Sequence, residues 1–158
     1  SMKIKLICIG KTSKSFLKEG EKEYLRRISH YCHIEKIEIS NLKNTKKLSI
    51  NEIKQKEGKL ILKHINNEDN IILLDERGKE FKSLDFSIYL DKKINLTRKT
   101  LSFIIGGSYG FSNEIYTRSN DQISLSKMTF SHQMIRLFFL EQIYRCYTII
   151  NGKPYHNE

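Results

Sequence analysis

The fold is decided by the stretch Thr100-Leu101-Ser102-Phe103-Ile104-Ile105-Gly106-Gly107-Ser108-Tyr109-Gly110, in which an apolar run leads directly into a loop with three glycines. Such a run predicts a buried strand of a parallel sheet. The glycines allow backbone N–H groups to approach a ligand that a Cβ would keep away. A second polar segment, Leu125-Ser126-Lys127-Met128-Thr129-Phe130-Ser131-His132, follows. We therefore expect the chemistry of this protein in the last third of the chain.

Outward from this strand, apolar runs alternate with amphipathic segments along the whole chain. The pattern predicts strands at 2–9, 34–39, 70–75, 100–105 and 121–125, and helices at 15–31, 49–65, 83–94, 113–118 and 131–150. Alternation of strand and helix without repeats or a linker predicts a single α/β domain over residues 2–158, with Ser1 as a cloning scar.

Local signals refine this outline at three places. The alternation of Ile and charged residues in 34–39 indicates a strand near the edge of the sheet. Ser49, with Glu52 three residues later, is expected to cap the second helix. Ser131 is the natural N-cap of the last helix. Between the second strand and the second helix, 41–47 is polar, rich in lysine and without periodicity, so we expect a loop there.

The charge of the chain suggests a polyanionic partner. Lys and Arg number 28 against 18 Asp and Glu, which gives a formal net charge of +10. Solvation of the surface by scattered lysines is an equally good explanation. The three cysteines have no C-x-x-C spacing, which favours a reducing cytoplasm over a disulfide framework and predicts no metal site. No long uncharged apolar run or signal peptide is apparent, so we expect no membrane association.

Loops at the carboxyl ends of parallel strands are where open α/β sheets bind ligands. Three such loops are expected, at Leu74-Asp75, Gly106-Gly107 and Leu125-Ser126. The first strand ends in a lone glycine, Gly10, which argues against a nicotinamide-binding Rossmann domain, and no Walker P-loop is present. Asp75 and Glu76 suit a ribose or a cation, or simply form a solvated turn.

The last predicted helix is apolar through a whole turn at Leu137-Phe138-Phe139-Leu140. Both of its faces therefore need cover, and we expect a second subunit, in a homodimer, to supply one of them. Glu141 and Arg145 are four residues apart and face the same way, as do His132 and Arg136. Taken alone, the Glu141–Arg145 pair is a routine intrahelical salt bridge.

Several motifs in the same order carry a resemblance to a known family. They are Leu74-Asp75, Ile105-Gly106-Gly107-x-x-Gly110, Leu125-Ser126-x-x-Thr129, His132, Glu141-x-x-x-Arg145 and Pro154-Tyr155-His156. With them the chain resembles, end to end, the RlmH (YbeA) family of small SPOUT methyltransferases. The resemblance implies an α/β knot, in which a mostly parallel sheet is flanked by helices and the C-terminal stretch forms a trefoil knot. General topology rules would have discarded this arrangement.

The resemblance also implies the cofactor S-adenosylmethionine, bound bent in the knot. The positions that carry over as cofactor-binding are Leu74, Gly106, Leu125, Ser126, Lys127, Met128, Thr129 and Phe130. The residue types agree with this role, because a flat adenine needs apolar walls while backbone groups read its polar edge.

Members of this family methylate N3 of a pseudouridine in helix 69 of 23S ribosomal RNA, on the assembled ribosome. The catalytic positions that carry over are Glu141, Arg145, Tyr155 and His156. Methylation requires removal of the weakly acidic N3 proton, for which His156 and Glu141 are the candidates. Arg145 or a protonated His156 would stabilise the negative charge on the base. One subunit's tail is expected to complete the cofactor pocket of the other.

Two other functions stay open at this point. One is a SPOUT methyltransferase that acts on another uridine-type base, for instance in tRNA. The other is a ribosome-binding factor that keeps the fold without catalysis, which would not bind the cofactor.

Overall fold

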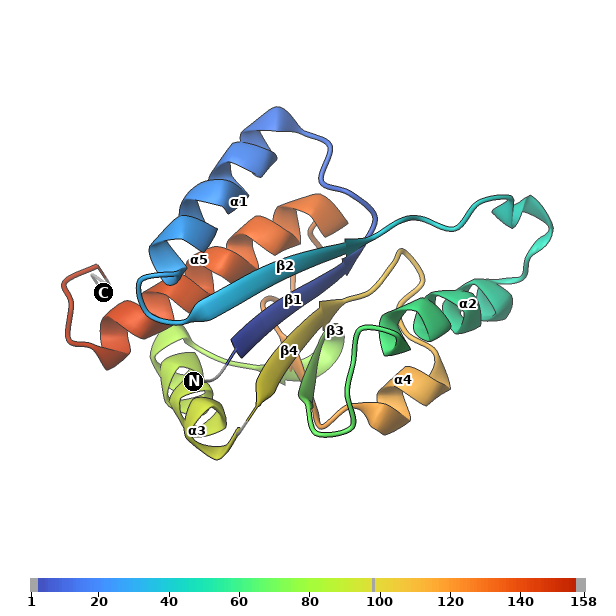
Figure 1. The fold of residues 1–158 in the computed structure, drawn as a ribbon. Helices are drawn as coiled ribbons and strands as arrows, with labels where there is room; N and C mark the ends of the chain where they lie inside the picture. Colours follow the sequence, from blue (N-terminus) through green and yellow to red (C-terminus); the bar gives the residue numbers. More distant parts are fainter. Residues whose placement is uncertain (1–2, 98, 156–158) are drawn as a thin grey trace.

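A computed structural model describes residues 3–97 and 99–155 of the chain (Figure 1). Strands and helices alternate in it. The elements are β1 (Lys3–Ile9), α1 (Ser15–Ile28), β2 (His33–Ile39), the 3-10 turn η1 (Thr45–Lys47), α2 (Ile50–Leu62), β3 (Asn70–Glu80), α3 (Ser83–Leu96), β4 (Thr100–Ile105), α4 (Asn113–Arg118), β5 (Asp121–Ser124) and α5 (His132–Ile150). Every predicted strand and helix is present, with its ends moved by a few residues, and the predicted α/β class is confirmed.

The five strands form one parallel sheet in the order β2-β1-β4-β3-β5. The central strand is β4, the apolar run that precedes the glycine loop, and five of its six residues are buried. The edge position predicted for 34–39 is confirmed, because β2 pairs only with β1 among the described strands. Since all strands are parallel, the loops after β3, β4 and β5 meet at one edge of the sheet.

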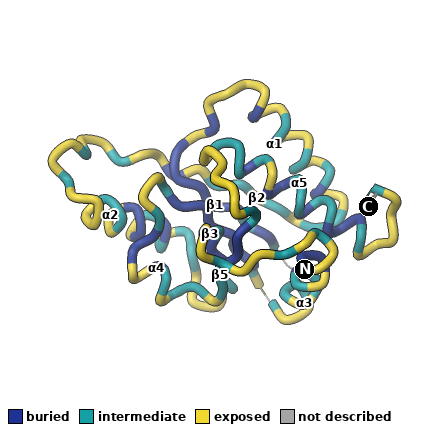
Figure 2. The backbone as a smooth tube through the Cα atoms, turned by 180° about the vertical axis from the view of Figure 1, so that it is seen from behind, coloured by how far each residue is buried: buried dark blue, intermediate teal, exposed yellow. Residues whose placement is uncertain are grey.

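Helices cover both faces of the sheet, so that the protein has three layers. One core cluster joins β1, β3 and β4 to α1, α3 and α5, with Phe103 against Phe139 at its centre (ring centroids 4.8 Å apart). The other cluster, on the opposite face, joins the sheet to α2 and α4 through Ile61 and Ile115. Figure 2 shows the result, with buried strands in the middle and exposed residues on the helices and loops around them.

The predicted helix caps are confirmed. The Ser49 hydroxyl accepts a hydrogen bond from the Glu52 N–H at 3.1 Å, and the Glu52 carboxylate accepts one from the Ser49 N–H at 3.0 Å, which completes a capping box. The Ser131 hydroxyl accepts from the Met134 N–H at 3.2 Å. These caps fix the first residues of α2 and α5.

The strand predicted at 70–75 is longer than expected, and this is a correction. β3 runs to Glu80, with a shift in register: Ile123 of β5 pairs with Leu74 and then again with Lys79. The residues between these two pairings bulge away from β5 and then return to it. Hydrophobicity could not indicate this second section, because 75–80 is polar. The trefoil knot implied by the resemblance stays a prediction.

The apolar turn of α5 is covered in two different ways. Phe139 and Leu140 are fully buried in the core. Leu137 packs against α1, where its methyl groups lie about 3 Å from the position that a Cβ would take on Gly20. Phe138 remains 37% exposed and contacts Phe130. Among the large apolar side chains of α5, Phe138 and, at the end of the helix, Ile150 (38% exposed) are therefore left for a partner.

Arg136, on the first turns of α5, is a buried cation. Its two terminal nitrogens have partners on β1, on the loop after β1 and on β2, while its Nε atom has no hydrogen-bond partner among the described residues. Its guanidinium donates to the Ile9 carbonyl at 2.8 Å and to the Thr12 hydroxyl at 3.0 Å, and lies 3.5 Å from the Glu38 carboxylate. Glu21 and Lys36 extend this network. Because a buried charge is tolerated only when it is paired, the network fixes the start of α5 above β1.

Candidate active site

A cavity of about 510 Å³ lies at the bulge of β3 and the carboxyl ends of β4 and β5. The three loops that the sequence singled out all contribute to its wall. Of the eight residues predicted to bind the cofactor, seven line it: Leu74, Gly106, Leu125, Ser126, Met128, Thr129 and Phe130. The eighth, Lys127, is exposed and is not among the lining residues. A cavity of this size accommodates a nucleotide-sized ligand.

The glycine loop forms one wall of this cavity. The Gly110 N–H donates to the Gly107 carbonyl at 3.1 Å, and Gly110 has a φ of +84°, which favours glycine. A Cβ on Gly106 would lie 2.9 Å from the ring of Phe111, and one on Gly107 would lie 2.6 Å from the Glu57 carboxylate. These two glycines are therefore needed for packing against the protein behind the loop. A larger side chain at Gly106 would first displace the ring of Phe111, which itself lines the cavity.

The segment 125–131 forms the opposite wall. Its turn is held by the Ser126 hydroxyl, which accepts from the Met128 N–H at 2.9 Å, while the Ser126 carbonyl accepts from the Ser124 hydroxyl at 2.9 Å. Met128 is 75% exposed, which is unusual for a large apolar side chain in an ordered turn. The cavity wall on this side thus combines the apolar side chains of Leu125 and Met128 with the polar side chains of Ser126 and Thr129.

The bulge of β3 places a polar cluster at the rim of the cavity. The Tyr116 hydroxyl is hydrogen-bonded to the Asp75 carboxylate, and Arg77 donates to the same hydroxyl at 2.6 Å. Burial, reinforced by the bond to Asp75, raises the pKa of Tyr116. Sequence reasoning identified Asp75 but missed Tyr116, which a short helix without a motif brings to the cavity.

His132 lines the cavity at the first residue of α5. Burial lowers its pKa, nearby Arg136 lowers it further, and a hydrogen bond with the Gly106 backbone acts in the opposite direction. The imidazole is therefore neutral at neutral pH. His132 thus connects the glycine loop to α5.

Glu57 of α2 lies behind the glycine loop and was not predicted as a site residue. Its side chain is buried, and its Oε1 atom has no hydrogen-bond partner among the described residues. Burial raises the pKa of this carboxyl above its ordinary value of 4.5. The signal for it in the sequence, Lys56-Glu57-Gly58, is a normal solvated pattern on a helix. Only the packing of α2 against the loop reveals it.

Replacing Glu57 by Gln should stabilise the protein at neutral pH. Because the pKa of Glu57 is raised in the folded state, its contribution to the free energy of unfolding is greatest below pH 4.5 and falls as the pH rises. Because the substitution removes an unpaired buried carboxylate, the free energy of unfolding should rise by roughly 1 kcal/mol at pH 7. Urea unfolding at pH 7 and pH 4 measures this difference, which should shrink at pH 4. With the exposed Glu19→Gln as control, a loss of stability at pH 7 would contradict the prediction.

The residues predicted to be catalytic form a second cluster on the last turns of α5 and the tail. The Glu141 carboxylate accepts hydrogen bonds from Arg145 at 2.8 Å, from the Tyr155 hydroxyl at 3.0 Å and from the Gln142 amide at 3.0 Å. The Arg145 guanidinium lies 5.0 Å from the centre of the Tyr155 ring. His156 lies outside the described residues. The structure thus brings three of the four predicted residues together.

Tyr155 is held as a hydrogen-bond donor in this cluster. Burial raises its pKa well above the ordinary value, as do the hydrogen bonds with Tyr24 and Glu141. The phenol is therefore neutral at physiological pH and cannot serve as a base there. Its ring also packs edge-on against Tyr144 at 4.9 Å, which anchors the tail to α5.

This cluster is separated from the 510 Å³ cavity within one chain. Arg145 is thirteen residues after His132 on α5, which corresponds to about 20 Å along the helix. Figure 1 shows the tail at the opposite end of α5 from segment 125–131. Glu141 lines a smaller neighbouring cavity of about 270 Å³, which shares Leu125, Ser126 and Phe130 with the larger one. Arg145 and Tyr155 line neither.

Other kinds of site were sought in the described part of the chain. No three His, Cys, Asp or Glu residues there are grouped as a metal site would require. Cys8, Cys32 and Cys146 are free thiols. Within residues 3–97 and 99–155, no helix has the length and apolar character needed to cross a membrane.

Comparisons with known proteins agree with this geometry. A family model described as "Predicted SPOUT methyltransferase" matches residues 2–156. A Parabacteroides distasonis protein named "Ribosomal RNA large subunit methyltransferase H" is 54% identical over 99% of this chain and 100% of its own length. Proteins with the same name from Christiangramia forsetii and Cytophaga hutchinsonii are 54% and 52% identical, each over 99% of this chain and at least 99% of its own length.

Proposed function

The chain belongs to the SPOUT methyltransferase family, and from this premise we propose that it methylates N3 of a pseudouridine in helix 69 of 23S ribosomal RNA. The observation that carries the proposal is the cavity at the bulge of β3 and the carboxyl ends of β4 and β5, whose wall contains seven of the eight residues expected for S-adenosylmethionine. The full-length relatives named as ribosomal RNA methyltransferases support the substrate class.

The residues of the cavity fit S-adenosylmethionine. Leu74, Leu125 and Met128 offer apolar surface for an adenine ring, and the backbone of the two loops offers groups for its polar edge. The carboxylates of Asp75 and Glu76 lie in the same wall and suit the positive charges of the cofactor. When bound, S-adenosylmethionine supplies an electrophilic methyl group attached to a positively charged sulfur.

The Glu141–Arg145–Tyr155 cluster suits the other half of the reaction. N3 of pseudouridine must lose its proton, and the base then carries negative charge. The guanidinium of Arg145 would stabilise that charge, since it is always protonated and offers several donors. Glu141 already accepts three hydrogen bonds, which favours a role in orienting Arg145 over a role as base. Of the two candidates for the base, this favours His156.

The separation of the two halves supports a composite site. A side chain about 20 Å along α5 from His132 does not reach the cavity of its own chain. We propose that the protein is a homodimer in which the tail of one subunit completes the cavity of the other. The exposed side chains of Met128, Phe130 and Phe138 lie beside the cavity and supply an apolar surface for this contact.

A methyl-transfer assay tests the proposal. Ribosomes that lack the modification are incubated with the protein and S-adenosylmethionine carrying a labelled methyl group, and the nucleosides of the 23S rRNA are analysed by mass spectrometry. We expect one labelled N3-methylpseudouridine. Absence of label, with cofactor binding demonstrated by calorimetry, would overturn the proposal. Label in tRNA instead would assign a different substrate, and absence of cofactor binding would favour a non-catalytic factor.

A further inference from the structure

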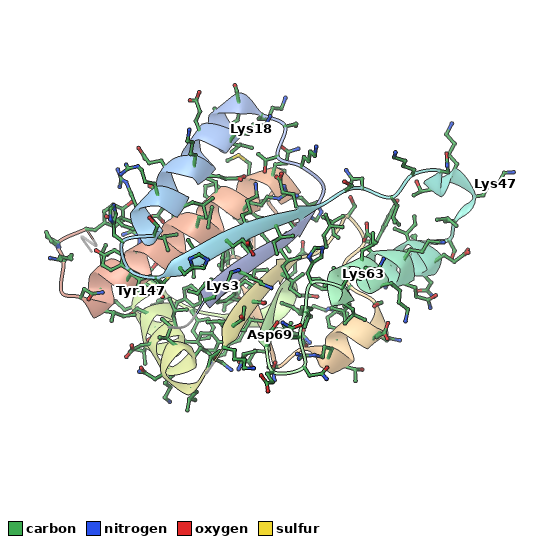
Figure 3. The ribbon with its side chains drawn as sticks, in the orientation of Figure 1. Lys3, Lys18, Lys47, Lys63, Asp69 and Tyr147 are labelled. Atoms are coloured by element: carbon green, nitrogen blue, oxygen red, sulfur yellow. The ribbon has the colours of Figure 1, made fainter. Side chains whose placement is uncertain are left out.

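The connection between β2 and α2 forms an exposed arm, defined here as residues 40–48. Figure 1 shows it projecting from the body of the protein, and Figure 3 shows Lys47 at its tip. Lys43, Lys46 and Lys47 are all exposed, and η1 holds the last two in a single turn. No acidic residue occurs between Glu38 and Glu52. The arm is therefore a concentrated, uncompensated positive charge.

A second exposed loop, residues 10–14, continues this charge toward the body of the protein. It carries Lys11 and Lys14. The Gly10 N–H donates to the Ile39 carbonyl at 2.6 Å, and the Asn41 amide packs closely against Gly10. The root of the arm and the start of this loop are thus in contact.

The same loop contacts Gln133, the residue next to the wall of the large cavity. The Ser13 N–H donates to the Gln133 side chain at 2.8 Å, and Gln133 also donates to the Ser13 hydroxyl at 3.0 Å. Gln133 follows His132, which lines the cavity. The arm, the 10–14 loop and the cavity therefore share the carboxyl edge of the sheet and are connected by direct contacts.

The lysines of this strip are not neutralised by the protein. Among the described residues, ion pairs engage lysines elsewhere, such as Lys36, Lys59 and Lys93, but not Lys11, Lys14, Lys43, Lys46 or Lys47. The carboxylate of Glu38, which lies beside the 10–14 loop, is already paired with Lys36 and Arg136. A run of exposed cations that the protein leaves unpaired is the electrostatic footprint of a nucleic-acid contact. Within the arm, Leu42 and Leu48 are half-buried, so the arm offers little apolar surface to a lipid.

We propose that the arm and the 10–14 loop bind the phosphate backbone of the ribosomal RNA next to the target nucleotide. This inference rests on the proposed function and names the surface that holds its substrate. Lysines act as point charges toward phosphates and carry no base specificity, so the strip sets affinity and orientation. The choice of base is left to the cavity and the cluster on α5.

The test compares two triple variants in the full-length protein. Lys43→Ala, Lys46→Ala and Lys47→Ala together remove the charge of the arm. The control, Lys22→Ala, Lys63→Ala and Lys92→Ala, makes the same change in charge at exposed lysines that lie outside the arm and the 10–14 loop. Rates of methyl transfer are measured over a range of concentrations of ribosomes lacking the modification. Cofactor affinity is measured by calorimetry.

We expect the arm variant to raise KM for ribosomes roughly 10- to 100-fold at physiological salt, with kcat and cofactor affinity unchanged. The slope of log Kd against log salt concentration should become shallower by up to about 3, one for each lost phosphate contact. The control should have the same KM for ribosomes and the same salt dependence as the wild-type protein.

Equal KM values for the two variants would overturn the inference while leaving the proposed function intact. If the wild-type protein bound ribosomes without methylating them, only the proposed function would be contradicted. The Kd values of the two triple variants for ribosomes would then still test the arm. If the arm variant instead lost binding to anionic lipid vesicles and kept its affinity for ribosomes, the strip would be a membrane contact and the inference would be wrong.

Discussion

Replacing Gly78 by Ala should destabilise the protein by about 3 kcal/mol or more. A Cβ on Gly78 would lie 2.5 Å from the Ile123 nitrogen, 2.6 Å from the Ile123 carbonyl carbon and 2.7 Å from the Gln122 carbonyl carbon. All three atoms belong to the backbone of β5, which cannot turn aside as a side chain does. The returning section of β3 would have to separate from β5, and the rim of the cavity would move with it.

Urea unfolding of the Gly78→Ala variant measures this effect, and soluble yield measures it if the variant fails to fold. Gly20→Ala is the matched control, because the Cβ added there meets only the methyl groups of Leu137, at 3.0 Å, within a helix that favours alanine. A Gly78→Ala protein as stable as the Gly20→Ala protein would show that β3 and β5 are not packed this closely.

Gly78 also marks where sequence reasoning about the fold reached its limit. The buried strands β1 and β4 were predictable because an apolar run that ends in glycine has few other interpretations. The start of α2 was predictable because the Ser49–Glu52 capping box is a local interaction. The second section of β3 depends on pairing with residues more than 40 positions away, and nothing in its own polar sequence indicates it.

The candidate site divides in the same way. Loops after parallel strands are predictable from the chain, and the resemblance then identified seven residues that line one cavity. Tyr116 and Glu57 were missed because they reach the site from helices whose sequences show no motif. The buried network of Arg136 was equally hidden, because the partners of Arg136 lie on β1, on the loop after β1 and on β2, and pairs within a single helix do not reveal them.

Replacing Arg145 by Ala should reduce turnover on ribosomes about a hundred- to a thousandfold and leave the affinity for S-adenosylmethionine within about twofold. The reason is the separation of the two halves of the site, since Arg145 does not line the 510 Å³ cavity. Gly106→Val should do the reverse. Its side chain would displace the ring of Phe111, which does line the cavity. The affinity for S-adenosylmethionine should therefore fall, while the rate of methyl transfer at saturating cofactor should change less.

Calorimetry with S-adenosylmethionine and single-turnover methyl transfer separate these two effects. Arg145→Lys serves as the matched variant, because it keeps the charge beside Glu141 but loses the forked geometry of the guanidinium, so we expect partial recovery of turnover. We expect the Arg145→Ala variant to stay folded, because an i,i+4 pair such as Glu141–Arg145 contributes only about 0.2–0.5 kcal/mol to the stability of a helix. If Arg145→Ala weakened cofactor binding as much as Gly106→Val does, Arg145 would belong to the cofactor-binding half of the site, and the division of labour between the two halves would be wrong.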